Sequence, residues 1–194
     1  SLVGAERYFK SNRKQILDFI ATLVRRNINA GKTTVLVSRK RFKALCAVEL
    51  ARRLAGWGLT VQFPTTTSAA HAIPNTHVVP VLHYGERGIN TYQLYDAAYC
   101  LNSYYVAPNV LNQALQEHAP RAFRIPLEIT LDHNRVRRVR IADPAHIHSG
   151  LDRLGDEFLH KLEVEPVLQA VGRVRFYTRA REVLFFQLAD MAPD

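Results

Sequence analysis

The sequence predicts an α/β fold with a mainly parallel sheet, flanked by helices and interrupted by a β-hairpin at about residues 125–141. Short β-branched runs recur along the chain, amphipathic segments separate them, and one alternating segment interrupts the series. Strands that alternate with helices are typical of parallel sheets, because parallel strands need a crossover connection. We expect residues 1–15 to form a linker or arm and residues 16–194 to form the domain.

The first half of the predicted domain is a strand–helix–strand unit. Apolar residues recur at helical spacing over 16–27, and Gly31 follows just past the predicted helix end. The β-branched run 33–38 predicts a buried strand, and Ser38 can cap the next helix, which we expect to end near Ala55. Residues 59–63 predict a second strand, reached by a right-handed parallel connection.

The segment Gly31-Lys32-Thr33-Thr34 is not a phosphate-binding loop of the Walker A type. That motif needs a glycine five positions before the Gly-Lys pair and a strand in front of it. Position 26 is arginine, and a predicted helix comes first. The sequence also lacks an Asp-Glu pair on a predicted strand. We therefore expect this chain alone to be inactive in hydrolysing a nucleoside triphosphate.

The second half places a glycine-containing loop after a strand. Residues 77–84 predict a third strand, which runs into Gly85-Glu-Arg-Gly-Ile-Asn90, and residues 97–106 predict a fourth. Ligands of open α/β sheets bind beyond the carboxyl ends of strands, where this loop is expected. A helix from Pro108 to about His118, the hairpin, a helix over 151–160 and a strand over 183–186 complete the series.

The segment Gln169-Ala-Val-Gly-Arg173 places a glutamine and an arginine at a spacing that suits phosphate binding on a helix. On a helix, Gln169 and Arg173 are four residues apart and share one face. Gly172 permits the close approach of a backbone or a phosphate, and a guanidinium offers a rigid fork of donors to phosphate oxygens. By itself the pattern fits equally well a helix face that reaches a polyphosphate held by a neighbouring domain and a surface helix end with scattered arginines.

The charge and residue content of the chain indicate which class of molecule it binds and in which compartment it works. A net charge of +9 and a pI near 9.9 favour a polyanion, most commonly nucleic acid. Cys46 and Cys100 lie in apolar segments, which indicates buried thiols in a reducing, cytoplasmic compartment. His146 and His148 have no cysteine partner, so we expect no metal, and no apolar run is long enough for a membrane span. The chain starts without methionine, which suggests a piece of a longer protein.

Three segments stand in an order that resembles a known family. They are Thr34-Val-Leu-Val-Ser-Arg-Lys40, Gly85-Glu-Arg-Gly-Ile-Asn90 and Gln169-Ala-Val-Gly-Arg-Val-Arg175. They resemble motifs IV, V and VI of the C-terminal RecA-like domain of superfamily 2 helicases and translocases. The resemblance covers roughly residues 16–188 and implies a RecA-like sheet. The Gln-Ala-Val-Gly-Arg form resembles DNA repair and replication members more than the His-Arg-Ile-Gly-Arg of RNA-handling ones, so we expect DNA rather than RNA.

The resemblance implies a role in ATP hydrolysis shared with another domain. Such a domain closes over ATP that is bound, with magnesium, to a preceding RecA-like domain of the same polypeptide. Arg173 would contact the γ-phosphate as an arginine finger. The family's second arginine falls at Phe176 here, so Arg175 is a displaced candidate for it. The other residues at the nucleotide would be Gln169, Arg87, Gly88 and Asn90.

The same resemblance, together with the basic charge, predicts nucleic-acid contacts. The expected residues follow the first strand, the third strand and the hairpin turn: Ser38, Arg39, Lys40, Arg41, Glu86, Arg135 and Arg137. Some helicases of this superfamily separate strands with a hairpin in the interval between motifs V and VI. The tip at 132–135 has that place, although a hairpin that merely extends the sheet is an equal alternative.

Two other functions stay open at this point. The chain could be a non-catalytic basic module that follows the phosphate backbone, with steep salt dependence and no need for Gln169 or Arg173. It could also be a small doubly wound enzyme that binds a phosphorylated substrate at the Gly85–Asn90 loop. Against the latter, the sequence offers no pair of general base and nucleophile.

Overall fold

A computed structural model describes residues 2–66, 73–86, 91–102, 104–118, 127–131, 137–141, 150–174 and 178–185. The contacts divide the chain into two compact units. We call Arg7–Ser103 with Pro166–Phe186 the sheet unit. The hairpin unit comprises Tyr104–Glu165, Ser1–Glu6 and Gln187–Asp194.

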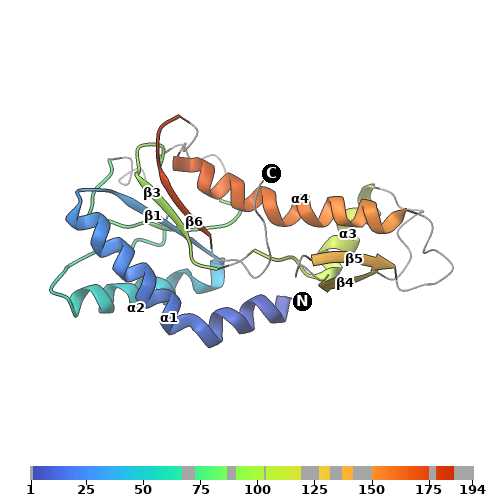
Figure 1. Cartoon of the computed structure of the whole chain (residues 1–194), viewed down its shortest axis with the longest axis horizontal. Helices are drawn as coiled ribbons and strands as arrows, with labels where there is room; N and C mark the ends of the chain where they lie inside the picture. The colour runs from blue at the N-terminus through green and yellow to red at the C-terminus, as the bar shows by residue number, and fades with distance from the viewer. Residues whose placement is uncertain are drawn as a thin grey trace. The chain divides into compact units, whose positions relative to one another are not determined.

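The sheet unit is built on a four-stranded, all-parallel sheet in the order β2-β1-β3-β6 (Figure 1). Its strands are β1 (Thr34–Ser38), β2 (Val81–His83), β3 (Ala97–Cys100) and β6 (Glu182–Phe185). In the register, Leu36 of β1 lies beside Val81 of β2 and Tyr99 of β3. The predicted α/β class, with a mainly parallel sheet flanked by helices, is confirmed and is consistent with a RecA-like fold.

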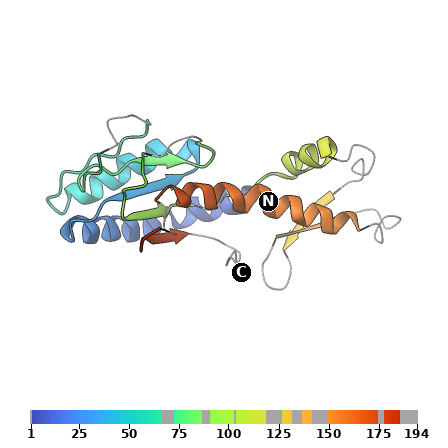
Figure 2. The same ribbon diagram turned by 90° about the horizontal axis from the view of Figure 1, so that it is seen from above.

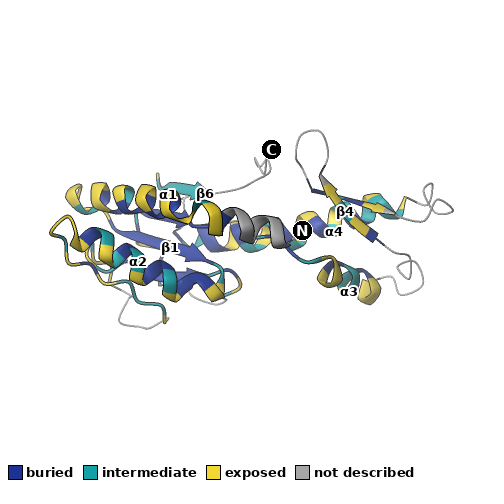
Figure 3. Ribbon diagram, turned by 90° about the horizontal axis from the view of Figure 1, so that it is seen from below, coloured by how far each residue is buried: buried dark blue, intermediate teal, exposed yellow. Residues whose placement is uncertain are grey.

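Two helices cover one face of this sheet: α1 (Leu2–Asn29) and α2 (Lys43–Ala55), which follows a short 3-10 helix, η1 (Lys40–Phe42). Figures 1 and 3 show α1 and α2 along the same face, with their exposed sides turned away from the strands. Leu17 and Ile20 of α1 pack with Leu50 of α2 against Leu36 of β1. The alternate strand positions are also buried, as expected for a sheet covered on both faces.

The other face receives the end of α4 (Leu151–Val171), a helix that begins in the hairpin unit. Figures 1 and 2 show its C-terminal turns on the side of the sheet opposite α1. Val167, Ala170 and Val171 are buried there. The α-helix ends at Val171, and a 3-10 helix, η4 (Gly172–Val174), follows it. The predicted helix over 151–160 and the helix of the Gln-x-x-Gly-Arg motif are therefore one continuous element.

The expected linker at residues 1–15 is instead helical from Leu2, because α1 continues without a break into it. Phe9 explains this difference: its ring is buried and lies 4.8 Å from that of Phe42, which gives the early turns an apolar anchor. At the other end, Gly31 has φ of +66°, a left-handed conformation that suits glycine after a helix. The chain thus reverses directly from α1 into β1.

The predicted second strand at 59–63 is wrong. The structure forms only an isolated parallel bridge there, between Gln62 and Val78. The neighbour of β1 is instead β2, which comes from the predicted third strand. Gln62 is exposed and Phe63 is only half-buried, so this segment lacks the two-sided burial that marks β1. The expected cap at Ser38 is also wrong, since η1 is preceded by Arg39 and has no side-chain cap.

The hairpin unit contains the predicted hairpin as the antiparallel pair β4 (Leu127–Leu131) and β5 (Arg137–Ile141). The predicted helix α3 (Pro108–His118) and the first turns of α4 pack against it through Leu111, Leu115 and Leu159. A Cβ added at Gly155 of α4 would lie 2.6 Å from Val139 Cγ1, so helix and strand touch closely there. The proposed tip at 132–135 falls outside the described residues.

Candidate functional site

The carboxyl edge of the sheet carries the candidate site. Strands β1, β2 and β3 are parallel, so the residues after them meet at one edge. Asn102 joins these ends: its Oδ1 accepts from the Arg39 N–H at 3.0 Å, and its Nδ2 donates to Ser38 Oγ at 3.0 Å. The Tyr84 hydroxyl donates to the Asn102 carbonyl oxygen at 2.5 Å. The edge is therefore held by a buried polar network and not by apolar packing alone.

Glu86 forms the centre of an ion-pair cluster beside this network. Its Oε1 lies 2.8 Å from Lys43 Nζ and 2.5 Å from His83 Nδ1, and its side chain is only 11% exposed. Burial alone would raise the pKa of Glu86, but the hydrogen bond and charge of Lys43, with His83, lower it below 4.5 overall. The cluster ties the first residue of α2 to the turn after β2, and it fixes a carboxylate at the carboxyl edge.

Arg173 lies next to this cluster, on η4. Its guanidinium is half-buried and interacts electrostatically with Glu86 and Tyr92. Burial lowers the pKa of Arg173, and the charge of Glu86 opposes that effect. Arg173 Nη1 and the Tyr92 hydroxyl are both buried, and neither finds a hydrogen-bond partner among the described residues. Buried donors without partners are rare and costly, so Arg173 and Tyr92 are suited to donate hydrogen bonds to the oxygens of a bound anion.

The surroundings of Gln169 and Gly172, the two other residues of the Gln-x-x-Gly-Arg motif, indicate a function less clearly than those of Arg173. Gln169 is exposed on the last turn of α4 and, because the α-helix ends at Val171, it does not share a continuous α-helical face with Arg173. A Cβ added at Gly172 would meet no described atom within 4 Å. No described part of this chain therefore needs glycine there for space, and the position is open to an approaching group.

The predicted nucleic-acid residues divide into accessible and buried ones. Lys40 and Arg41 are exposed on η1, and Arg39 is partly exposed before it. Ser38 is fully buried in the Asn102 network, and Arg137 is buried in the hairpin unit, where it pairs with Glu163. Both side chains are engaged inside the protein, and their predicted contacts with nucleic acid stay predictions. Glu86 is engaged by Lys43 and His83, which leaves it a structural partner at this edge.

Several predicted residues lie outside the described part of the chain. They are Arg87, Gly88 and Asn90 of the loop after β2, Arg135 of the hairpin, and Arg175 after η4. Their predicted roles stay predictions. Both Cys46 and Cys100 are buried free thiols, as the sequence indicated, and burial raises the pKa of each, to about 11 and about 12.

Sequence reasoning missed Tyr92, Lys43 and His83. Nothing in the spacing of Lys43 indicates that its side chain turns inward to Glu86. His83 is three residues before Glu86, a separation that favours contact in a turn and was a usable signal. Tyr92 follows the glycine-containing loop closely, but its burial depends on residues from distant segments.

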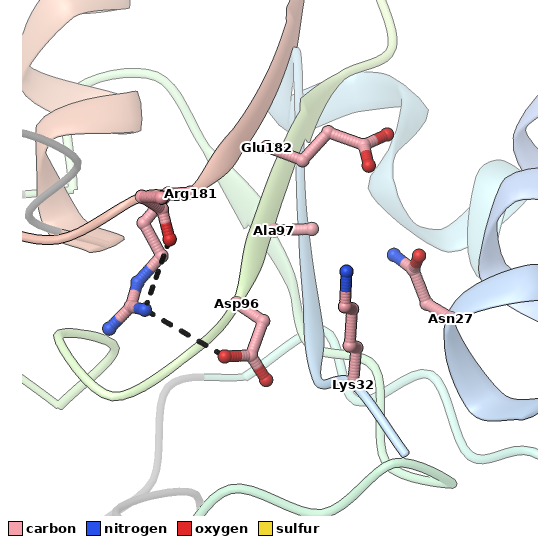
Figure 4. Close-up of a pocket in the computed structure, with 7 residues that line it drawn as sticks. Asn27, Lys32, Asp96, Ala97, Arg181 and Glu182 are labelled. Carbon is pink, nitrogen blue, oxygen red and sulfur yellow. Dashed lines mark hydrogen bonds and ion pairs between the residues drawn. The ribbon is translucent and has the colours of Figure 1, made fainter. Parts of the chain in front are cut away.

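A cavity of about 330 Å³ lies at the opposite, amino edge of the sheet. Figure 4 shows Lys32 extending its amino group between Ala97 and Asn27, toward Glu182, while Arg181 turns to Asp96. Asp96 Oδ2 also accepts hydrogen bonds from the Thr33 N–H and hydroxyl, each at 2.9 Å. These contacts join the start of β1 to the segments before β3 and β6. None of the sequence-predicted site residues lies in this cavity.

No family model, curated protein or solved structure matches this chain. Within the residues that the structure describes, no helix is both long and apolar enough to cross a membrane. The same residues contain no cluster of three or more histidine, cysteine or acidic side chains placed to hold a metal ion. The function must therefore be argued from the geometry of the carboxyl edge.

Proposed function

We propose that this chain is the C-terminal motor domain of an ATP-dependent nucleic-acid helicase or translocase. In this proposal it supplies Arg173 to a nucleotide held by a preceding RecA-like domain, and it contacts nucleic acid, DNA rather than RNA, along its carboxyl edge. The observation that carries the proposal is the buried, unpartnered nitrogen of Arg173 beside Tyr92. The order of the three motif-like segments along a parallel α/β unit supports it.

The residues present suit an oxygen-rich anion. Arg173 provides a fixed positive charge with a free donor, and Tyr92 provides a hydroxyl that is buried and available. Glu86 keeps the guanidinium charge partly compensated while no anion is near, which lowers the cost of burying it. ATP would supply the phosphoryl group, and the charge on its oxygens in the transition state is what an arginine at this place stabilises.

Positioning follows from the local structure. The 3-10 turn places Arg173 directly after the buried end of α4, so the guanidinium starts from a fixed backbone. The Glu86 cluster occupies one side of it through Lys43 and His83. The open space at Gly172 lets the surface of another domain come near the same turn. Arginine is therefore held ready, and the nucleotide ligands that this chain lacks come from the partner domain.

The test is ATP hydrolysis by the full-length protein that contains this chain, with and without single-stranded DNA. Arg173→Ala is expected to lower turnover by roughly 10³- to 10⁵-fold, the range for loss of an arginine finger. Arg153→Ala is the matched control, because Arg153 is an exposed arginine of α4 whose side chain is 84% exposed. DNA-stimulated turnover that survives Arg173→Ala would refute the finger role.

The same assay separates the proposal from the basic binding module. A module without catalytic duty would bind DNA in the full-length protein while neither variant changed turnover. No hydrolysis in any form, together with salt-dependent DNA binding, would favour the module and refute the motor. The isolated chain is expected to show no hydrolysis in either case.

A further inference from the structure

We infer that the segment 10–14 of α1 joins η1 in one surface that binds the phosphate backbone of a nucleic acid. The inference rests on the nucleic-acid part of the proposed function and adds residues of α1, a helix to which the motif-like segments assign no role. The surface, which we call the α1–η1 basic surface, consists of Lys10, Arg13, Lys14, Lys40 and Arg41.

The structure brings the two segments together through their aromatic residues. Phe9 of α1 and Phe42 of η1 have ring centroids 4.8 Å apart, and both side chains are buried. The Arg41 guanidinium carbon lies 4.9 Å from the centre of the same Phe42 ring. Lys10 and Lys40 each lie within two residues of this aromatic contact, so cations from both segments surround it.

The helical spacing adds Arg13 and Lys14. Arg13 is four residues after Phe9 and therefore shares its face, which is turned to η1 and α2. Burial raises the pKa of the Cys46 thiol of α2, and the positive charge of Arg13 acts in the opposite direction, which places that charge near α2. Lys14 is four residues after Lys10, so these two side chains lie on one face of α1, next to the face of Phe9 and Arg13. All five side chains of the surface are exposed.

The carboxylates of the sheet unit are committed elsewhere. Every one whose side chain the structure describes forms an ion pair with a cation outside the α1–η1 basic surface. The pairs are Asp18–Arg53, Glu49–Arg53, Glu86–Lys43, Asp96–Arg181 and Glu182–Arg26. None of these five ion pairs includes a residue of the α1–η1 basic surface.

The chemistry of the surface selects its partner. Exposed lysine and arginine side chains bind phosphates through charge and hydrogen bonds, and they position a nucleic acid without reading its bases. The surface borders the carboxyl edge of β1, on which Arg39 also lies. Since the turn between α1 and β1 reverses the chain, the early part of α1 returns to that edge. A strand that follows η1 would therefore reach α1.

The experiment measures binding of a fluorescent single-stranded DNA, and of an RNA of equal sequence, to the full chain by anisotropy at several salt concentrations. The test variant combines Lys10→Gln, Arg13→Gln and Lys14→Gln. The control combines Arg52→Gln, Arg153→Gln and Lys161→Gln, which removes the same charge from exposed positions elsewhere. Circular dichroism of both variants establishes that α1 keeps its helical content.

We expect each cation removed from the phosphate backbone to weaken binding about 5-fold at 0.1 M salt, which makes the triple test variant roughly 100-fold weaker. The slope of log K against log salt should fall in magnitude by about 2, while the control keeps the parental slope. Equal affinity and slope in the test and control variants would overturn the inference. If binding instead disappears only in Lys40→Gln with Arg41→Gln, α1 is refuted and the nucleic-acid role of the proposed function stands.

Two further outcomes distinguish failure of the α1–η1 basic surface from failure of the proposed function. Failure of the parental chain to bind either nucleic acid would overturn the surface, while the ATP hydrolysis assay on Arg173 would still judge the finger. Binding to vesicles of anionic phospholipid with no binding to either oligonucleotide would show that the surface serves a membrane, and would also overturn it.

Discussion

The buried ion pair of the hairpin unit allows a sharp prediction about stability. Glu163 of α4 accepts hydrogen bonds from Arg137 of β5 and from the Val106 N–H, the latter at 2.9 Å. Arg137 Nη2 donates to the Val106 carbonyl at 3.2 Å, and its guanidinium lies 4.8 Å from the centre of the Tyr105 ring. The pair thus joins three segments: β5, α4 and the chain before α3.

The perturbation is Glu163→Gln, which keeps the shape of the side chain and removes its charge. Both side chains of the pair are 6% exposed, so the change leaves the Arg137 charge buried without its counter-ion. Arg137 Nε is already buried without a partner among the described residues, which offers no compensation. Breaking a buried pair in this way costs about 3–5 kcal/mol.

The assay is amide hydrogen exchange, followed by mass spectrometry of peptides from the hairpin unit and the sheet unit. Because 1.4 kcal/mol is a factor of ten, protection over α3 and β5 should fall roughly 10²- to 10⁴-fold. Burial raises the pKa of Glu163 to about 7 against the opposing charge of Arg137. The buried carboxylate therefore carries a desolvation cost that glutamine avoids, and we expect the loss of protection to lie at the lower end of this range.

The control is Glu165→Gln, which removes the same charge from an exposed position on the same helix. It should leave exchange unchanged. Combining Arg137→Met with Glu163→Leu should recover part of the loss, because no uncompensated charge stays buried. Unchanged protection in Glu163→Gln would refute the reasoning, and so would an equal effect of Glu165→Gln.

Three other predictions follow from single positions. Gly172→Ala should leave the melting temperature within a few degrees of the parent, because its Cβ meets no described atom; slower ATP hydrolysis by the full-length variant would then report a partner at that turn. Glu86 has a lowered pKa, so its contribution to stability is present above pH 4.5 and is lost as pH falls through its folded pKa. In urea unfolding at several pH values, Glu86→Gln should therefore lose less stability than the parent as the pH falls. An equal loss in both proteins would contradict the role of Lys43. Gly155→Ala should destabilise the hairpin unit by about 1–3 kcal/mol in urea unfolding, because its Cβ overlaps Val139. An unchanged unfolding midpoint would refute this close contact.

The fold was largely predictable because periodicity reports burial. The β-branched run of β1 correctly indicated a buried strand, and the alternation over 127–131 correctly indicated a hairpin. Two errors have physical causes. The early turns of α1 are helical although their apolar residues show no sustained helical period, and the buried Phe9 packs on Phe42 there. The segment at 59–63 has strand-forming residues but lacks a neighbour on both sides.

The candidate site was predictable only in its position. Ser38 and Arg137 show why, since a local pattern does not tell whether a polar side chain faces solvent or a buried partner. The partners that decide this, Asn102 and Glu163, are 64 and 26 residues away. Likewise, the sequence does not show that Arg173 Nη1 lacks a hydrogen-bond partner, because that depends on the residues that surround Arg173 and Tyr92 in the folded chain.

The position of β6 has a consequence for how the chain matures during synthesis. This strand completes the sheet by pairing with β3, yet the whole of Tyr104–Glu165 is synthesised between the two. The Arg26–Glu182 pair likewise joins residues 156 positions apart. During synthesis, the edge of β3 that pairs with β6 therefore stays unpaired until β6 has been made. The hairpin unit can form earlier, because its contacts join residues that are nearer in sequence. Such distant pairings close slowly, so sheet completion is the expected late step.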